Sequence, residues 1–383
     1  MLQGLGEVEK NLNMLSIPFM ALIGDPKQTL GGMIHHTNPA AIYFDFNPLR
    51  GPRALQKSIA DQAQCAVYVV DTHNVIPAWE LSNKQEYAAR TIRPKVLAKI
   101  ADYLIVPGQA IKHPYVWPGI VKDLSTLSEL IDELLEKVPS NGQKLSLKSG
   151  EIAANKALKD FIANRLAGYH ENRNDPSLDG VSGLSPYLHF GQLSSLRIAV
   201  EVESAVGEQP SLRLDADVFL EELIVRKELS DNFCYYNPMY DQLSGAAQWA
   251  QDTLAKHTAD PREFIYSYKQ FADAQTHDPA WNAAQKQLTV TGKMHGYMRM
   301  YWAKKVLEWS EDAQTAVGTL IKLNDFYSID GGDPNGYVGI LWSVAGVHDR
   351  PWFERDVYGS IRYMNYNGLK RKFNIEGYIQ THG

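Results

Sequence analysis

The stretch that decides the fold is residues 41–74, which read AIYFDFNPLRGPRALQKSIADQAQCAVYVVDTHN. Two short runs within it, Ala41-Ile-Tyr-Phe44 and Ala66-Val-Tyr-Val-Val70, have the length and the β-branched or aromatic content of strands. Between them, residues 51–62 carry apolar side chains at helical spacing. A strand, a helix and another strand in succession are typical of a parallel sheet in an α/β fold.

Upstream of this stretch, residues 2–15 have the apolar spacing of a helix, and residues 17–24 read as a further strand that ends in a turn. The pattern predicts an open sheet of the doubly wound kind. Such a sheet usually grows outward from a first central strand, whereas this chain begins at a helix. We therefore expect residues 1–110 to form an α/β domain, truncated because its first strands are missing.

Residues 107–149 are irregular, with Pro114, Pro118 and Pro139, a turn-rich Pro139-Ser-Asn-Gly142 and one helical stretch at 124–136. They predict an interdomain linker over residues 111–150. Helical periodicity then dominates, and no convincing strand follows. The clearest helical stretches are residues 152–166, 193–206, 217–232, 281–288 and 296–309. The predicted fold class is thus α/β plus all-α, with a helical domain over residues 151–383.

Composition limits the class of protein. The 383 residues are 44% hydrophobic and 21% charged, which is ordinary for a globular protein, and no apolar run is long enough to span a membrane. Residues 1–10 lack the features of an export signal, so we expect a cytoplasmic protein, and separately we expect a monomer. Cys65 and Cys234 suit reduced thiols, with neither a disulfide nor a metal site. The net charge of −6 argues against nonspecific coating of nucleic acid.

The common catalytic signatures are absent: there is no P-loop, no Gly-x-Gly-x-x-Gly after a strand, no His-Glu-x-x-His and no Gly-x-Ser-x-Gly. What remains is a series of polar and aromatic clusters. Residues 182–192 are either a phosphate cradle at a helix start or a capped loop. Charged side chains in the helix at 221–236 usually mean a solvated face. Trp302 and Trp309, seven residues apart, share a helical face where core packing is the default.

Two more clusters complete the series. Residues 324–342 read as a polar, glycine-bearing loop that runs into an aromatic segment, and its Asp-Gly-Gly-Asp-Pro-Asn-Gly could be turn chemistry alone. A calcium loop is the alternative, but the EF-hand spacing of ligands is not met. The last cluster is Val347-His-Asp-Arg-Pro-Trp352, followed by Arg355 and Arg362.

Together and in this order, these segments resemble the FAD-binding region of photolyases and cryptochromes, and specifically that of class II cyclobutane pyrimidine dimer photolyases. The resemblance is carried by Ser185-Pro-Tyr-Leu-His-Phe-Gly-Gln192, Asp231-Asn-Phe-Cys-Tyr-Tyr-Asn237, Thr291-Gly-Lys-Met-His-Gly296, Tyr301-Trp-Ala-Lys-Lys305 and Asp333-Pro-Asn-Gly-Tyr337. It extends to Asp71-Thr-His-Asn-Val-Ile-Pro77 and Trp79, and so spans nearly the whole chain.

The resemblance implies a helical domain that holds FAD bent into a U. Matching positions for contacts to the FAD phosphates and ribityl chain are Tyr169, Val181, Ser182, Gly183, Leu184 and Ser185. Arg299, Asn324 and Asp330 match the surroundings of the isoalloxazine, where a cation and polar groups stabilise the reduced anionic flavin. Family members commonly carry an antenna chromophore in the N-terminal portion, which puts an antenna in doubt for a chain that lacks its first strands.

The implied reaction is the light-driven repair of UV-damaged DNA, in which excited FADH⁻ passes an electron to a flipped-out pyrimidine dimer and the cyclobutane ring splits. Base flipping is an established property of photolyases, so this step comes with the resemblance. The matching catalytic residues are Glu222 as hydrogen-bond partner of the dimer, Met300 and Trp342 as walls of its pocket, and Arg299 and Asn324 at the flavin. Trp302 and Trp281 match an electron relay to oxidised flavin, which Trp309 extends.

The matching DNA-binding residues are Arg173, Arg226, Arg350, Trp352 and Arg362, of which Trp352 and Arg362 are expected to fill the gap left by the flipped dimer. Arg226 stands where some family members carry Trp, and its planar group can still stack. Two rival functions stay open. One is a cryptochrome-like blue-light photoreceptor without repair activity, and the other is a noncatalytic DNA-binding remnant that holds no flavin.

Overall fold

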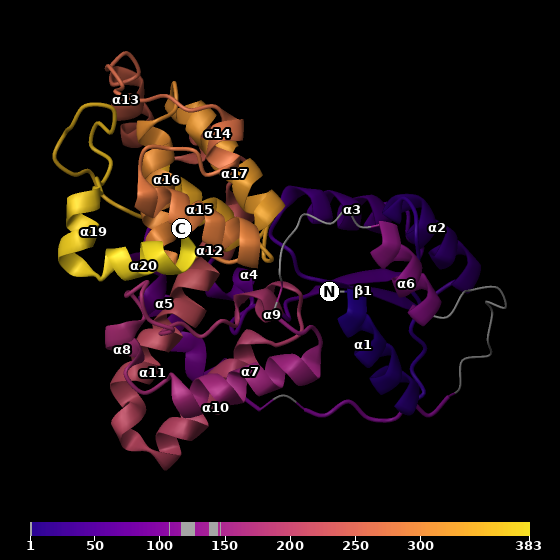
Figure 1. Ribbon diagram of the computed structural model, residues 1–383. Helices are drawn as coiled ribbons and strands as arrows, with labels where there is room; N and C mark the ends of the chain where they lie inside the picture. Colours follow the sequence, from indigo (N-terminus) through magenta and orange to yellow (C-terminus); the bar gives the residue numbers. More distant parts are fainter. Residues whose placement is uncertain (1, 107, 116–126, 138–144, 146) are drawn as a thin grey trace.

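The computed structural model describes residues 2–106, 108–115, 127–137, 145 and 147–383. The chain forms a smaller part that contains β1, α1, α2, α3 and α6 and a larger part made of helices (Figure 1). Pro118 and the segment Pro139-Ser-Asn-Gly142, which we expected in the linker, lie outside the described residues. The combination of a small parallel sheet with a helical part confirms the predicted fold class, α/β plus all-α.

The smaller part contains the predicted strand, helix and strand. β1 (Ala41–Asp45) pairs in parallel with β2 (Ala66–Val70), with Ala41 opposite Ala66 and Asp45 opposite Val70. The connecting helix is α3 (Arg50–Ala60). Helix α2 (Pro26–Thr37), which the sequence analysis missed, packs against α3, and α1 (Leu2–Met14) packs against α6 (Leu127–Lys137).

The strand expected at residues 17–24 is wrong. This segment has no strand conformation, and within the described residues the sheet has two strands, β1 and β2. A strand is defined by its ladder of hydrogen bonds to a neighbour, and an apolar run that finds no neighbour stays irregular. Pro18, which has no backbone N–H, further weakens such a ladder.

The loop after β2 leaves the sheet and joins the helical part. The buried Glu228 accepts hydrogen bonds at Oε1 from the backbone N–H groups of Val75 (2.8 Å) and Ile76 (3.3 Å). Helices α4 (Ala78–Leu81) and α5 (Ala89–Tyr103) follow this loop. Their apolar side chains share one core with residues 154–229, so the loop anchors the sheet to the helices that hold the candidate site.

The larger part begins with α7 (Glu151–Asn164), α8 (Tyr169–Asn172), α9 (Ser185–His189), α10 (Ser195–Glu208), η1 (Pro210–Leu212), α11 (Arg213–Leu220), η2 (Glu221–Arg226) and α12 (Lys227–Tyr236). It continues with η3 (Leu243–Gly245), α13 (Gln248–Lys256), α14 (Tyr268–Ala272), α15 (Pro279–Thr291), α16 (Gly296–Glu308), α17 (Ala313–Tyr327), α18 (Pro334–Ala345), α19 (Tyr366–Lys372) and α20 (Ile375–His382). In the described chain after residue 150, the only β pairing is an isolated bridge between Arg355 and Gly359.

Two predicted segments differ from the observed helices. The helix expected at 217–232 is α11 and α12 joined by η2, a π-helix in which each turn holds one residue more than usual. The polar loop expected at 324–342 is in fact the end of α17, a short turn and then α18. Asp333 caps α18 by accepting from Asn335 N, and Pro334 occupies its first turn, so turn-forming residues here begin a helix.

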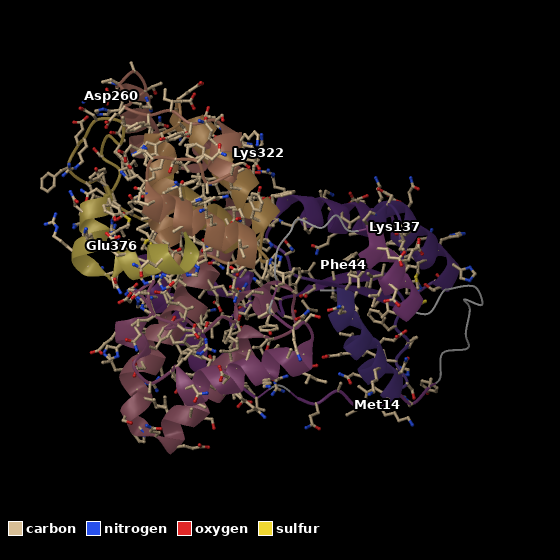
Figure 2. The ribbon with its side chains drawn as sticks, in the orientation of Figure 1. Met14, Phe44, Lys137, Asp260, Lys322 and Glu376 are labelled. Carbon is tan, nitrogen blue, oxygen red and sulfur yellow. The ribbon has the colours of Figure 1, made fainter. Side chains whose placement is uncertain are left out.

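A second core fills the rest of the larger part, from Phe233 to Tyr378, with Trp281 and Trp302 among its most buried side chains. Charged side chains such as Lys322 and Glu376 lie on the outside (Figure 2). Of the helices described, none has the length and apolar character needed to cross a bilayer. Cys65 and Cys234 are both free thiols.

Candidate functional site

A cavity of about 790 Å³ lies within the helical part, and we call it the central cavity. Its walls come from residues 176–187, the junction of α15 and α16, the end of α17 with the following turn, and α20. Eight of the nine predicted cofactor residues line it: Val181, Ser182, Gly183, Leu184, Ser185, Arg299, Asn324 and Asp330. Its volume falls in the range of sites that hold small molecules and cofactors.

The backbone brings these walls together through helix ends. α15 stops at Gly292, whose φ of 71° is left-handed, and Lys293 and His295 follow directly. The His295 side chain then caps α16 by accepting a hydrogen bond from Tyr297 N (3.1 Å). This sharp connection turns Lys293 and His295 toward the cavity and places Arg299 one turn into α16.

Two cations face the segment 181–185 across the cavity. Lys293 Nζ donates to the carbonyl of Gly183 (3.0 Å), and burial lowers the pKa of this lysine. Gly183 has a φ of 70°, a left-handed conformation that glycine adopts without strain. Arg165 donates to the carbonyl of Val181 (2.8 Å). A lysine and an arginine beside a serine-rich loop form a donor set suited to phosphate oxygens.

Another part of the cavity wall is an ordered polar network around Arg299. Its guanidinium donates to Asn324 Oδ1 (2.6 Å) and to Ser328 Oγ (2.8 Å), and lies 4.0 Å from the carboxylate of Asp330. Burial opposes ionisation of Asp330, yet Arg299 together with hydroxyl donors from Ser185 and Ser328 holds the pKa of this carboxyl below its usual value. A charged pair is therefore retained in a place that excludes much of the water.

Two observations test whether the cavity suits a bound group. The ring nitrogen Nε2 of His295 is buried without a hydrogen-bond partner among the described residues, although His295 lines the cavity. A Cβ atom at Gly336 would come within 2.9 Å of Asn324 Nδ2, so this glycine keeps room at the cavity wall. An unsatisfied polar atom, free space and the cations described above fit a large anionic ligand such as FAD.

Tyr169 is the predicted cofactor residue that does not line the central cavity. Its ring is packed edge-on against Phe161 (5.6 Å between ring centroids) and Phe219 (5.5 Å). Burial, with a contribution from the Glu222 carboxylate, raises the pKa of Tyr169 to about 12. Tyr169 thus belongs to the core next to Glu222.

Glu222 lies in the π-helix η2 and pairs with Arg173, whose Nη1 is 2.7 Å from Glu222 Oε1. The neighbouring Glu221 binds Arg93 (2.6 Å) and Arg226 (3.2 Å). Two predicted DNA-binding arginines are therefore tied to adjacent carboxylates of the same widened helical turn. π-helices often occur at functional sites because they redirect side chains without ending the helix.

Trp342 lies between the side chains of Lys304 and Arg362. Lys304 Nζ is 5.0 Å from its ring centroid, and the Arg362 guanidinium carbon is 5.4 Å away. Arg362 also lies over Trp352 (4.3 Å), as does Arg350 (5.8 Å). The structure thus brings four predicted residues, Arg350, Trp352, Arg362 and Trp342, into one alternating stack of cations and rings. The half-buried Met300 lies on α16, which packs against the helix of Trp342, α18.

The predicted relay residues Trp302, Trp281 and Trp309 form a continuous series. Trp281 is 6.5 Å from Trp302 and 6.1 Å from Trp309, measured between ring centroids. Two of these indoles have a partner for their N–H: Trp302 donates to Gln285 Oε1 (2.8 Å) and Trp281 to the carbonyl of Trp302 (3.0 Å). None of the three is among the described residues that line the central cavity.

Sequence reasoning missed several residues that line the central cavity. Lys293 and His295 were inside a quoted motif, Thr291-Gly-Lys-Met-His-Gly296, but received no role. Their signal was present, because a lysine and a histidine after a helix-ending glycine are well placed to face a ligand. Tyr378, Thr381 and His382 of α20 also line the cavity, and nothing in their local sequence indicates it.

Comparisons with known proteins point to one family. A family model described as DNA photolyase matches residues 1–112. The deoxyribodipyrimidine photo-lyase of Arabidopsis thaliana is 45% identical over 387 residues, covering 99% of this chain and 77% of that protein. Proteins of the same name from Potorous tridactylus (42% over 386 residues; 98% and 70%) and Methanothermobacter thermautotrophicus (38% over 385 residues; 99% and 82%) are similar across comparable lengths.

Two solved structures share the fold. A bacterial class III photolyase from Agrobacterium tumefaciens superposes with a TM-score of 0.73 at 19% identity, covering 100% of this chain and 76% of the other. A cryptochrome from Synechocystis superposes with a TM-score of 0.76 at 18% identity, covering 99% and 76%. At such low identity the likeness concerns the fold alone.

Proposed function

Because this chain belongs to the DNA photolyase family, we propose that it repairs UV-damaged DNA by splitting cyclobutane pyrimidine dimers in light, as a class II member of that family. The enzyme is accordingly a deoxyribodipyrimidine photo-lyase, the name of its relatives at 38–45% identity. The observation that carries the proposal is the central cavity, where Arg299 and Asn324 face the segment 181–185. The class assignment rests on the motifs quoted above, from residues 185–192 to 333–337.

The cofactor of the proposal is FAD in its reduced form, which when bound supplies the electron that splits the dimer after excitation by light. Ser182 and Lys293 would hold the phosphates, because they present a hydroxyl and an ammonium donor at the cavity wall. Ser185, whose hydroxyl donates to Asp330, would contact the ribityl chain. Arg299, Asn324 and Asp330 would surround the isoalloxazine. Their prearranged hydrogen bonds stabilise negative charge there without rearrangement of the side chains.

The lesion pocket of the proposal uses Glu222, Met300 and Trp342. A carboxylate accepts hydrogen bonds from the N–H edges of pyrimidines, and the indole offers a face for their rings. Arg173 orients Glu222 through the 2.7 Å ion pair, and Tyr169 supports that pair from the core. The π-helix η2 widens the turn from which Glu222 projects.

Damaged DNA would lie along Arg173, Arg226, Arg350, Trp352 and Arg362. Trp352 is exposed and stacked under Arg362, so it is available to replace an extruded pair within the base stack. Buried Trp302, Trp281 and Trp309 supply a path along which electrons cross the core. We further propose a monomer with an α/β domain at 1–110, a linker at 111–150 and a catalytic helical domain at 151–383.

An antenna chromophore stays outside the proposal, although the smaller part has space for one. A cavity of about 680 Å³ lies beside the sheet, lined among others by Phe44, Arg53, Trp79 and Tyr235. An absorption band in the purified protein that flavin does not account for would identify such a chromophore. A pure flavin spectrum would agree with its absence.

The test uses the purified protein with reduced FAD and an oligonucleotide that carries one thymine dimer. Blue light is expected to restore the undamaged oligonucleotide, with a dark sample as control and a 6–4 photoproduct as the alternative substrate. Retained flavin without any repair would favour the photoreceptor function, which no observation here favours. A colourless protein that takes up no FAD would sink the proposal and support a DNA-binding remnant.

A further inference from the structure

Another cavity, of about 500 Å³, opens beside Trp309, and we call it the outer cavity. It shares no lining residue with the central cavity. Trp309 is also the last ring of the tryptophan series, since it contacts Trp281 but has no ring contact with Trp302. The outer cavity therefore meets the series at its far end.

The outer cavity gives solvent molecules their approach to the indole of Trp309. This side chain is only 3% exposed, because the ring of His277 lies against it at 4.8 Å and Phe264 stacks on His277 at 3.9 Å. All three rings line the cavity. A molecule that enters this space can come into contact with Trp309.

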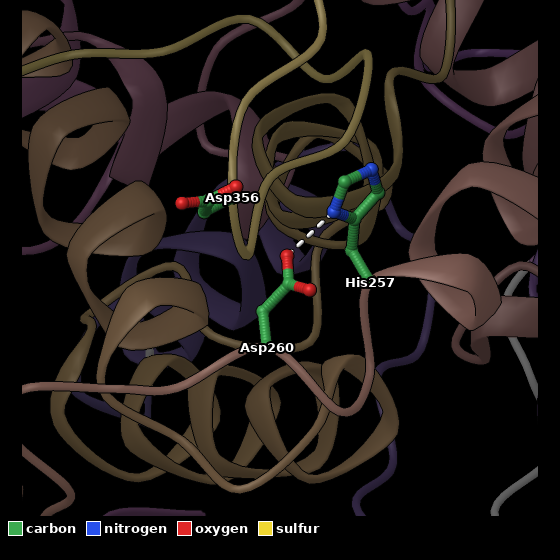
Figure 3. A group of neighbouring side chains, drawn as sticks. All are labelled: His257, Asp260 and Asp356. Atoms are coloured by element: carbon green, nitrogen blue, oxygen red, sulfur yellow. Dashed lines mark hydrogen bonds and ion pairs between the residues drawn. The ribbon is translucent and has the colours of Figure 1, made fainter.

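One wall of the outer cavity is a tight hairpin held in a strained conformation. Val357 has a φ of 66°, which is unfavourable for a β-branched residue, and its N–H donates to Asp260 Oδ2 (2.8 Å). Asp260 also binds His257 Nδ1 (2.5 Å), as Figure 3 shows, and His257 Nε2 binds Glu354 (2.8 Å). These bonds fix the hairpin to the end of α13, and strain of this kind is frequent at functional sites.

The same group is the one cluster of potential metal ligands in the described chain: His257, Asp260 and Asp356. Both ring nitrogens of His257 are already bonded to carboxylates, and in Figure 3 the Asp356 carboxylate lies beside the pair without an interaction to it. We therefore assign the cluster to bracing the cavity wall, not to a metal ion.

The polar lining is of mixed charge. Arg355 stacks on Tyr363 (4.9 Å), and no described carboxylate forms an ion pair with it. Glu308 is neutralised by Lys305 (2.5 Å), whereas Glu263 and Asp356 stand without ion-pair partners in the described structure. A complementary ligand would place negative charge at Arg355 and hydroxyl donors at the two carboxylates.

We propose that the outer cavity binds a small polyhydroxylated enediol anion that acts as one-electron reductant of Trp309. The inference rests on the proposed function, in which Trp309 gives up an electron toward the interior and is left as a radical cation. The enediol monoanion then loses one electron to Trp309 and one proton to water. Trp309 returns to its neutral state, and the enediol leaves as its radical anion.

The test measures blue-light reduction of oxidised flavin in the holoprotein at increasing ascorbate, and separately at increasing dithiothreitol, a neutral donor. The wild-type rate is expected to saturate with ascorbate. Arg355→Glu should raise the half-saturating ascorbate concentration by about tenfold or more, the effect of roughly 1.4 kcal/mol. Arg355→Lys, which keeps the positive charge, should have a half-saturating concentration close to that of wild type. Arg371→Glu, at an exposed arginine of α19, is the matched control and should leave it unchanged.

A second measurement, equilibrium dialysis of ascorbate in the dark, reports binding whether or not flavin is retained. Saturable binding that Arg355→Glu weakens and Arg371→Glu does not would support the proposal. A rate linear in ascorbate, or the same half-saturation in wild type and Arg355→Glu, would overturn it while dithiothreitol still drives photoreduction. Loss of photoreduction with both donors in wild type would instead count against the proposed function.

Discussion

The indole rings of Trp281 and Trp302 lie nearly parallel, 13° apart, and Trp281 Nε1 donates to the backbone carbonyl of Trp302 (3.0 Å). This bond holds the Trp281 indole against the helix that carries Trp302, and the bond from Trp302 Nε1 to Gln285 holds the other indole. Trp309 adds a third ring at 65° to Trp281. The three indoles can pack the core and also carry electrons. A substitution that slows photoreduction of the flavin without affecting repair would show the second role.

Replacement of Trp302 by Phe tests the path. Trp302→Phe preserves an aromatic ring but loses the indole and its bond to Gln285, so photoreduction of oxidised flavin should slow by at least about tenfold, equivalent to roughly 1.4 kcal/mol on the barrier. Repair by chemically reduced enzyme should stay close to wild type. Transient absorption and a repair assay on the same preparation measure the two. An equal loss of both activities would contradict the assignment.

Glu222 should matter for repair more than for flavin. Glu222→Ala removes the carboxylate bound to Arg173, and neither residue lines the central cavity. We expect the repair yield to fall by about tenfold or more, as when a hydrogen bond to a charged group is lost, with the flavin content unchanged. Glu222→Gln should keep part of the yield. Purification of the Ala variant as apoprotein would refute the assigned role.

Lys293 should anchor the cofactor. Lys293→Met keeps the aliphatic stem but removes the ammonium that faces residues 181–185, so the Kd for FAD should rise by about 10- to 100-fold, the equivalent of 1.5–3 kcal/mol for a charge-assisted bond. The affinity should also depend less on salt. Fluorescence titration with FAD at two ionic strengths measures both effects. An unchanged Kd would place the phosphates elsewhere.

Glu228 predicts a pH dependence of stability. Burial raises the pKa of this carboxyl to about 8, so the folded chain holds a proton that the unfolded chain has lost above its ordinary pKa of 4.5. This contribution to stability is therefore present at low pH and disappears as the pH rises through 8. Glu228→Gln keeps an acceptor for Val75 and Ile76 but does not titrate. The free energy of unfolding of the variant minus that of wild type should therefore be roughly 2–4 kcal/mol larger at pH 9 than at pH 5. Urea unfolding at both pH values measures the difference, which would be the same at each if the group did not titrate there.

Lys304 predicts the opposite slope. Burial lowers the pKa of this lysine from 10.5 to about 7, and its Nζ has one hydrogen bond, to the carbonyl of Ser343 (2.9 Å). The unfolded chain then binds the extra proton between pH 7 and 10.5, so stability rises with pH across that interval. Lys304→Met should be more stable than wild type by roughly 1–4 kcal/mol at pH 7 and by less at pH 10. The exposed Lys322→Met is the control, and a gain that does not change with pH would argue against titration of Lys304.

The sequence predicted those parts of the fold that depend on local pattern. The apolar runs of β1 and β2 and the helix between them were identified because strand length, β-branched or aromatic content and helical spacing are properties of a few neighbouring residues. The segment 17–24 is also an apolar run but has no partner strand among the described residues, and strand pairing depends on distant parts of the chain. The same limit hid the start of α18, where Asp333 and Pro334 fit a turn and a helix cap equally well.

The part of the candidate site that could be predicted from the sequence consists of residues that lie in or beside short motifs. Residues 181–185 and Arg299, Asn324 and Asp330 all line the central cavity. The contribution of α20 could not be foreseen, because Tyr378 reaches the cavity only through the packing of α20 on α15. Tyr169 is the opposite case. Its position in the motif predicted a contact with the cofactor, but its ring packs against Phe161 and Phe219 and does not line the central cavity.

The extra residue held by η2 bears on how this helix tolerates length changes. In a regular α-helix each residue advances the direction of the chain by about 100°, so removing one swings every later side chain to a new face. Within Glu221–Arg226 a single deletion would instead let the wide turn close into ordinary ones, and Lys227, Glu228 and Asp231 would keep their orientation toward the loop after β2. The helix could thus be shortened here with its frame intact, at the cost of re-aiming Glu222.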